Sequence, residues 1–204
     1  MSKKRVYVYV DGFNLYHALD DLGEPHLKWL NLWSLSEKLI RGDEEVSAVK
    51  YFTAYARWRP PSLRRHQRYV AALEAHGVQS IIGHFKVKRI RCKAACQQTF
   101  ETHEEKETDV NIGTHLVADT LTDQFDRALV ISADTDLNAA VNLARAHSIR
   151  KLIDIVAPPR RKNRNSAALF AITRGKVATS LLPANVTLPD GREIARPERY
   201  NPPA

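Results

Sequence analysis

Cysteine is scarce in this sequence, and long hydrophobic runs are missing from it. Two cysteines in 204 residues cannot form a disulfide framework, which fits a reducing compartment. No apolar stretch approaches the roughly 20 residues that span a bilayer. The opening MSKKR runs into a short predicted strand and not into the core of a signal peptide. We therefore expect a cytoplasmic protein with no membrane partner.

Acidic residues are fewer than basic ones. The chain has 23 Asp and Glu against 31 Lys and Arg, for a formal net charge of +8 and a pI near 9.6. A basic surface concentrates polyanions, so this balance favours nucleic acid as a partner, with solubility alone as the alternative explanation. The 44% hydrophobic content is enough to bury a full core. We predict one domain over residues 1–182, followed by a proline-rich, extended tail over 183–204.

Short apolar segments alternate with helical patterns along most of the chain. Predicted strands cover residues 5–10, 46–54, 78–82, 128–132 and 151–156, and predicted helices cover 14–20, 32–40, 62–75, 106–121 and 134–146. The crossovers are long enough for βαβ units, which predicts a parallel, doubly wound α/β sheet. A cysteine-containing insertion rich in Lys and Arg interrupts the pattern at 83–103. Further on we expect a short last helix at 166–172 and a small hairpin at 186–194.

Four aspartates stand at or near the ends of predicted strands or the starts of predicted helices. Asp11 follows the first strand, Asp134 and Asp136 follow the fourth, and Asp109 lies near the start of the helix at 106–121. The carboxyl ends of parallel strands share one edge, where ligands bind. Carboxylates gathered there repel one another and lose hydration, a cost that a divalent cation would relieve. The sequence therefore predicts an acidic magnesium or manganese site.

Each aspartate also has a purely structural explanation. Asp11 can stabilise the turn at Gly12 or cap the following helix, and Asp134 can cap its helix with Asp136 in the acidic first turn. Asp109 can form an ion pair with a lysine one turn earlier, Lys106. Only the expected proximity of the four aspartates to one another favours the metal site over these structural roles.

Three blocks in this order resemble the NYN domain family of PIN-like nucleases: VYVDGFNL at 8–15, EKETDVN at 105–111 and ISADTDL at 131–137. The resemblance implies a PIN-like three-layer sandwich whose central, mostly parallel sheet has five strands, the first of them in the middle. It also implies a metal-dependent ribonuclease-like centre, in which Asp11, Asp109, Asp134 and Asp136 bind the ion and Asn14 is a supporting polar contact. Ala133 stands where many relatives have glycine, a departure that removes no ligand.

The predicted activity is metal-dependent hydrolysis of RNA by an endoribonuclease, with Mg²⁺ or Mn²⁺ as cofactor. Single-stranded DNA is not excluded as a substrate, and monomer and homodimer are both left open. The alternative is a non-catalytic nucleic-acid- or protein-binding module whose acids hold a structural metal. A haloacid dehalogenase-type phosphatase is disfavoured because it needs a second acid two residues after the first, where this chain has Phe13. A flavin-binding protein is disfavoured because a carboxylate stands where a hydroxyl-rich phosphate loop belongs.

Three basic segments are candidates for binding phosphates: residues 57–65, 86–91 and 160–164. The first and third follow predicted strands and so share the edge of the acids, although a solvated surface is the common role of such charges. Trp58 can stack on a base or pack against the fold. The predicted nucleic-acid contacts are Arg57, Trp58, Arg59, Arg64, Arg65, Lys106, Arg160, Arg161, Lys162 and Arg164.

The two cysteines suggest a zinc site as one option. Cys92 and Cys96, with His103 and a fourth ligand such as His84, are the candidate ligands. The spacing between the cysteines is one residue longer than in a zinc knuckle, and no second cysteine pair exists. Free, reduced cysteines are the alternative.

Overall fold

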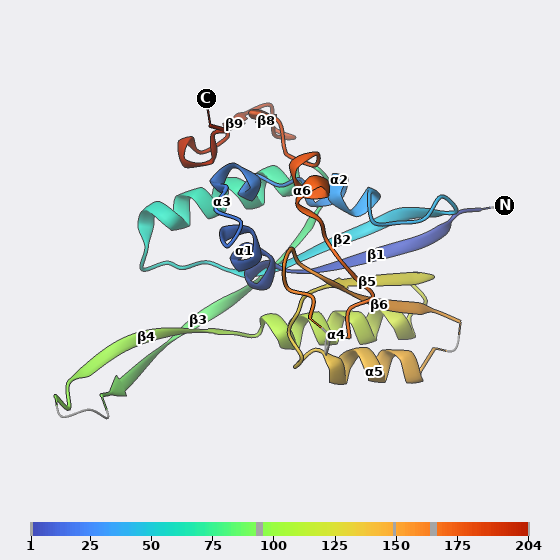
Figure 1. Ribbon diagram of the computed structural model, residues 1–204, viewed down its shortest axis with the longest axis horizontal. Coiled ribbons are helices and arrows are strands. Elements are labelled where there is room, and N and C mark those ends of the chain that lie inside the picture. Colours follow the sequence, from blue (N-terminus) through green and yellow to red (C-terminus); the bar gives the residue numbers. More distant parts are fainter. Residues whose placement is uncertain (1, 93–95, 149, 164–166, 204) are drawn as a thin grey trace.

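The computed structural model of the chain describes all residues except 1, 93–95, 149, 164–166 and 204. It has an α/β fold around a seven-stranded sheet in the order β4-β3-β2-β1-β5-β6-β7 (Figure 1). The strands are β1 (Lys4–Asp11), β2 (Glu44–Ala54), β3 (Gln79–Arg91), β4 (Thr99–Lys106), β5 (Arg127–Ile131), β6 (Leu152–Ala157) and β7 (Phe170–Ala171). All pairs are parallel except β3 with β4. The predicted central position of the first strand is confirmed.

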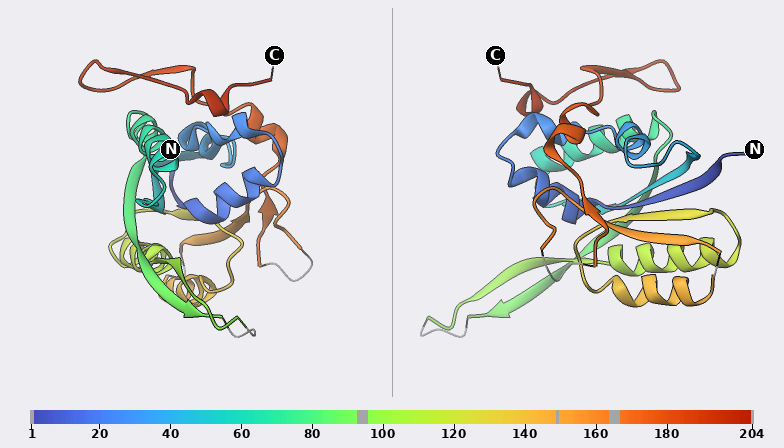
Figure 2. Two further views of the ribbon diagram at one scale, coloured as in Figure 1. Left: turned by 90° about the vertical axis from the view of Figure 1, so that its left-hand side faces the viewer. Right: turned by 45° about the vertical axis from the view of Figure 1, so that its right-hand side comes forward.

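The prediction of five strands is wrong by two. The insertion at 83–103 is not a break in the sheet, because β3 continues through it to Arg91 and turns back as β4. The resulting hairpin projects away from the body of the protein (Figures 1 and 2). Its side chains are mostly exposed on both faces, so its sequence lacks the alternation of apolar and polar residues that marks a half-buried strand. The hairpin is held together by the backbone hydrogen bonds between β3 and β4.

The expected last helix at 166–172 is also wrong. Residue 166 lies outside the described residues, and Phe170–Ala171 form β7, which pairs in parallel with the end of β6. An unpaired sheet edge offers hydrogen bonds to any nearby backbone, so tertiary position decided the state of this short segment.

Helices cover both faces of the sheet and make three layers (Figures 1 and 2). One face carries α1 (Gly12–Asp20), α2 (Leu32–Glu37), α3 (Pro60–Glu74) and α6 (Arg174–Ala178), and the other carries α4 (Thr108–Leu121) and α5 (Asn138–Ala146). Successive side chains of a strand point to opposite faces. Val8 and Val10 therefore join the larger core, while Tyr9 joins the core beneath α4 and α5.

Two helices begin later than the sequence predicts. α4 begins at Thr108 because Lys106 still belongs to β4, and Glu107 takes a left-handed backbone (φ 77°) between the two elements. α5 begins at Asn138. Asp134 and Asp136 therefore lie in the loop after β5, where their backbone is not committed to a helix.

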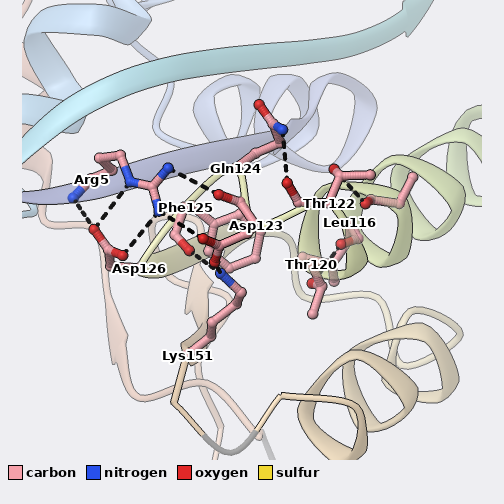
Figure 3. A network of polar contacts seen from close by, with 10 residues as sticks. Arg5, Leu116, Thr120, Thr122, Asp123, Gln124, Phe125, Asp126 and Lys151 are labelled. Atoms are coloured by element: carbon pink, nitrogen blue, oxygen red, sulfur yellow. Dashed lines mark hydrogen bonds and ion pairs between the residues drawn. The ribbon is translucent and has the colours of Figure 1, made fainter.

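A polar network ties the start of β1 to the loop before β5 (Figure 3). The Arg5 backbone N–H donates to Asp126 Oδ2 (2.7 Å) and its guanidinium donates to Asp126 Oδ1 (3.1 Å) and the Asp123 carbonyl (2.9 Å). Lys151 Nζ donates to the Phe125 carbonyl (2.5 Å). These contacts hold three segments at the amino edge of the sheet, opposite the edge that carries the acids.

The segment after residue 182 contains the expected hairpin, formed by β8 (Asn185–Thr187) and β9 (Glu193–Ala195). A 3-10 helix, η2 (Glu198–Tyr200), follows, and another, η1 (Pro25–Lys28), lies between α1 and α2. Val186 and Tyr200 are buried in the larger core, so this segment packs against the domain and is not simply extended. Among the described helices, none has both the length and the apolar character needed to cross a bilayer.

Candidate active site

Asp11 is the most buried acid at the carboxyl edge, with 4% of its surface exposed. It ends β1 and caps α1: Oδ1 accepts from the Asn14 backbone N–H (3.0 Å) and Oδ2 accepts from Ser132 Oγ (2.8 Å). Burial raises the pKa of this carboxyl, against the lowering effect of both hydrogen bonds. The capping role and a metal-binding role are compatible, since each carboxylate oxygen keeps a second lone pair.

Gly12 follows Asp11 because of space, not because of an unusual backbone angle. A Cβ atom here would lie 2.5 Å from the Phe52 carbonyl oxygen and 2.8 Å from a ring carbon of Tyr51. Only glycine lets the turn between β1 and α1 approach the end of β2 this closely. The carboxylate of Asp11 is thereby set at the edge of the sheet.

The loop after β5 is held against this turn by side chains. Asn14 Oδ1 accepts from the Ala133 backbone N–H (3.0 Å), and Ser132 Oγ accepts from the Asp134 backbone N–H (3.0 Å). Asp134 Oδ1 in turn accepts from the Asp136 backbone N–H (2.9 Å). Asn14 thus joins the two loops that carry Asp11 and Asp134.

Three of the four predicted aspartates meet at one pocket of about 500 Å³: Asp11, Asp109 and Asp134. Asp136 is exposed and does not line this acidic pocket, although it adds to the negative potential at Asp109. The remaining lining residues are Phe13, Asn14, His17, Glu105, Ala133 and Arg161.

Glu105 is the acid that sequence reasoning missed. It reaches the pocket from β4, and its Oε1 accepts from the backbone N–H (3.1 Å) and the hydroxyl of Thr108, at the start of α4. Its place in the 105–111 block was the available signal. The sequence pattern of this segment indicates a loop followed by a helix. It therefore does not reveal that Glu105 lies on β4, paired with Phe85 of β3.

Gathering these acids has an electrostatic cost. Partial burial, together with the charges of Asp11, Asp134, Glu105 and Asp136, raises the pKa of Asp109 to about 6. A cation bound among the carboxylates would relieve this repulsion.

The donor set of the pocket fits a hard cation such as Mg²⁺ or Mn²⁺. In the described part of the chain, no three His, Cys, Asp or Glu side chains stand close enough together to enclose an ion by themselves. Mg²⁺ in phosphate-processing enzymes is commonly held by one or two carboxylates, waters and substrate phosphate, and not by a closed protein cage. The pocket fits that open mode of binding.

The alternative explanation of Asp109, an ion pair with Lys106, does not hold in this structure. Lys106 lies on β4 and its Nζ pairs with Glu104 Oε1 (2.8 Å), because helix α4 begins two residues later than predicted.

The predicted nucleic-acid contacts separate into groups. Arg161 lines the acidic pocket and pairs with Asp21, and Arg160 donates to the Asp21 carbonyl (3.3 Å). Lys162 Nζ donates to the Leu169 carbonyl (2.7 Å), and Arg164 lies outside the described residues. Trp58, Arg59 and Arg65 line a second cavity, and Arg57 and Arg64 are exposed.

The zinc candidates are not brought together. His103 pairs with Val87 in the hairpin ladder, whereas Cys92 lies beyond the last pair, about 16 Å away along the strand at roughly 3.3 Å per residue. The ring of His103 stacks on Trp58, and His84 pairs with Glu107 (3.1 Å). Cys92 and His103 therefore do not lie close enough to share one ion, and no disulfide joins Cys92 to Cys96.

An aromatic cavity of about 510 Å³ adjoins the acidic pocket and shares Phe13, His17 and Glu105 with it. Ten of its 22 lining residues carry aromatic rings, among them Tyr51, Trp58, His66, Tyr69, Phe85 and His103. Sequence reasoning identified only Trp58, because the other rings come from elements that are distant in the chain.

Comparison with known proteins gives one family match and two similar proteins. The NYN domain profile matches residues 5–171. A curated relative, 6-hydroxy-3-succinoylpyridine 3-monooxygenase HspA of Pseudomonas putida, is 29% identical over 241 aligned positions covering 96% of this chain and 75% of that protein. The crystal structure of a protein of unknown function from Vibrio parahaemolyticus superposes with a TM-score of 0.54 at 17% identity, covering 89% of this chain and 98% of that one. That likeness concerns the fold alone.

Proposed function

This chain belongs to the NYN domain family, and from that premise we propose that it is a metal-dependent endoribonuclease that hydrolyses RNA phosphodiester bonds at the acidic pocket. The observation that carries the proposal is the meeting of Asp11, Asp109 and Asp134, from three distant segments, in one pocket where the pKa of Asp109 is raised to about 6. The net charge of +8 attracts a polyanionic substrate to the protein as a whole. At the acidic pocket, a cation between the carboxylates and the scissile phosphate would allow that substrate to bind.

One or two of the carboxylates of Asp11, Asp109 and Asp134 would hold the ion together with waters and the substrate phosphate, and Glu105 stands beside them as a further acid. Bound Mg²⁺ or Mn²⁺ would supply a coordinated water of lowered pKa and neutralise charge on the scissile phosphate. Asn14 holds the loop after β5 beside Asp11, because its Oδ1 accepts a hydrogen bond from the Ala133 backbone N–H. Arg161 lines the same pocket and is placed to pair with a phosphate oxygen.

Replacing Asp11 by Asn tests the proposal, because the amide keeps the oxygen that caps α1 but removes the charge. We expect Mn²⁺-dependent cleavage of single-stranded RNA to fall by at least about 100-fold, as for the loss of a principal electrostatic group. Asp43→Asn is the matched control, since Asp43 pairs with Lys4 (2.9 Å) near the start of β1, away from the pocket. Intact RNA with wild type and variant alike would contradict the proposal. RNA binding without cleavage would favour the non-catalytic binding module.

A second candidate function comes from the curated relative, whose name describes oxidation of a substituted pyridine. The observation in its favour is the aromatic cavity, which offers ring surfaces and the basic side chains of Arg59 and Arg65 to a planar ring that bears a carboxylate. Such a monooxygenase inserts one atom of dioxygen and reduces the other to water with electrons from an added reductant. Oxygen uptake that depends on 6-hydroxy-3-succinoylpyridine and a reduced nicotinamide would support this function over RNA cleavage.

A further inference from the structure

Four rings form a continuous row beside the acidic pocket. Phe13, in α1 next to Asn14, packs edge to face with Phe85 of β3 at 5.5 Å between ring centroids. Phe85 packs edge to face with Trp58 at 4.7 Å, and Trp58 stacks on His103 of β4 at 3.6 Å. The row therefore leads from the acids through β3 and the loop after β2 to β4.

This row borders the aromatic cavity, which opens beside the acids. The cavity, of about 510 Å³, shares Phe13, His17 and Glu105 with the acidic pocket. Its volume lies within the range of roughly 300–1,000 Å³ typical of sites that bind small molecules. A ligand in the cavity would thus lie next to whatever occupies the acidic pocket.

The polar groups of the cavity suit a neutral, planar, hydrogen-bonding ring. His66 is uncharged at neutral pH because burial lowers its pKa to about 4, and its Nε2 lies 3.2 Å from Thr53 Oγ1. Arg65 Nε is buried and has no hydrogen-bond partner in the described part of the chain. Lys28 in the lining is already paired with Asp20, so the positive charge open to a ligand comes from Arg59 and Arg65, which suits a phosphate attached to the ring's sugar.

We propose that this aromatic cavity is a subsite for one unpaired nucleobase of the RNA strand whose phosphate occupies the acidic pocket, an inference that rests on the proposed ribonuclease function. Aromatic side chains bind bases through their faces, which every base presents. A base in a duplex is stacked and paired on its edges, so it would have to leave the helix before it could enter. The subsite therefore selects single-stranded segments and excludes bases that are paired in a duplex.

Binding measured with Ca²⁺ in place of Mn²⁺ separates this subsite from cleavage, because a hard cation still lies between the acids and the phosphate while the ion that is expected to support hydrolysis is absent. The probe is a short single-stranded RNA with one 2-aminopurine, followed by fluorescence anisotropy for affinity and by 2-aminopurine quenching for stacking. We expect wild type to quench the probe, and Trp58→Ala to bind about tenfold more weakly with the quenching abolished. Ala56→Phe, which keeps every ring but fills the cavity at one of its lining residues, should have the same effect.

Phe100→Ala is the matched control, since Phe100 is an aromatic residue 49% exposed on β4 that lines neither pocket. Its affinity and quenching should stay within twofold of wild type. Unchanged quenching in both Trp58→Ala and Ala56→Phe, in protein that still cleaves RNA with Mn²⁺, overturns the subsite and leaves the proposed function standing. Wild-type protein that neither binds nor cleaves RNA overturns both. A cavity that takes 6-hydroxy-3-succinoylpyridine without displacing RNA overturns the subsite alone.

Discussion

At the residue scale, one carboxylate has both a structural and a proposed chemical role. Asp11 caps α1 through the Asn14 backbone N–H and contacts Ser132, the residue that also bonds the Asp134 backbone. The common structural use of an Asp-Gly pair is therefore present in this protein, and it does not compete with the site. The cap fixes the direction of the side chain, which is what an ion-binding group requires.

The raised pKa of Asp109 predicts a pH-dependent cost to stability. Folding raises this pKa from 3.8 to about 6, so its favourable contribution is complete below about pH 4 and disappears as the pH rises through 6. Above pH 6 the ionised carboxylate opposes folding. We expect Asp109→Asn to stabilise the metal-free protein at pH 8 by about 1 kcal/mol, a small value because solvent screens this exposed group.

Urea unfolding in EDTA at pH 4.5 and pH 8 measures this effect. The stabilisation by Asp109→Asn should shrink toward zero at pH 4.5, where the wild-type carboxyl is protonated. Adding Mg²⁺ at pH 8 should raise the free energy of unfolding of wild type more than that of the variant. An equal gain at both pH values would show that charge repulsion is not the cause.

Gly12 allows a second prediction at this scale. Gly12→Ala places a methyl group 2.5 Å from a backbone carbonyl oxygen of β2, which cannot move aside as a flexible side chain would. We expect a loss of about 1–3 kcal/mol of stability, as for other overpacked sites, together with displacement of Asp11 and loss of cleavage. Gly42→Ala, which meets no atom within 4 Å, is the control for thermal unfolding. Wild-type stability in Gly12→Ala would disprove the close approach.

At the scale of elements, the β3–β4 hairpin changes how the site is built. It extends the sheet at an exposed edge, where cross-strand pairs such as Arg89 with Glu101 (3.0 Å) place charges that discourage pairing with other chains. Its base supplies Phe85 and Glu105 to the two pockets. A segment that read as an interruption of the fold therefore completes the proposed site.

The loop after β6 is the element that we expect to bind the RNA backbone. Arg160 and Arg161 follow β6, and Arg161 lines the acidic pocket. Changing both to Ala should reduce the slope of log affinity against log salt by about 0.7 for each phosphate of a single strand that these arginines neutralise. Binding titrations at salt concentrations from about 50 to 200 mM measure this slope. The double change of Arg192 and Arg196 to Ala, in the segment of β9, is the control, and equal slopes for both double variants would remove this loop from the interface.

At the scale of the whole molecule, the two edges of the sheet have different roles. The amino edge contains buried ion pairs: Arg127, 2% exposed, donates to Glu44 Oε2 (2.9 Å) and to Asp154 Oδ2 (2.7 Å). These pairs join β5 to β2 and β6 across the sheet. The carboxyl edge instead gathers like charges, which raise the pKa of Asp109. The amino edge thus stabilises the fold, whereas repulsion between the acids of the proposed site destabilises it at the carboxyl edge.

Breaking the buried ion pairs at the amino edge should be severe. Arg127→Met leaves Glu44 buried without its partner, and we expect a loss of about 3–5 kcal/mol in urea unfolding. The double change Arg127→Met with Glu44→Leu should recover part of that loss because no unpaired charge is left between the two positions. A single variant less than about 1 kcal/mol below wild type would contradict this account of the edge.

Much of the fold was predictable because local patterns carried it. Buried apolar runs identified the five parallel strands at the centre of the sheet, and the small hairpin formed near the predicted residues. Three acids that follow strands or begin a helix were expected together and do line one pocket. Asp136 was expected there as well but is exposed and lies outside that lining, because the loop after β5 extends through it before α5 begins at Asn138.

By itself the sequence determined the five central strands of the sheet and the edge at which the acids gather, because burial acts on neighbouring residues and leaves a periodic pattern of apolar side chains. Only the tertiary structure decided that β4 and β7 join the sheet, that Glu105 enters the acidic pocket and that four rings from separate elements form one row. Those features rest on backbone hydrogen bonds and packing between distant segments. Backbone hydrogen bonds are available to almost any residue, so they leave no signature in the order of side chains.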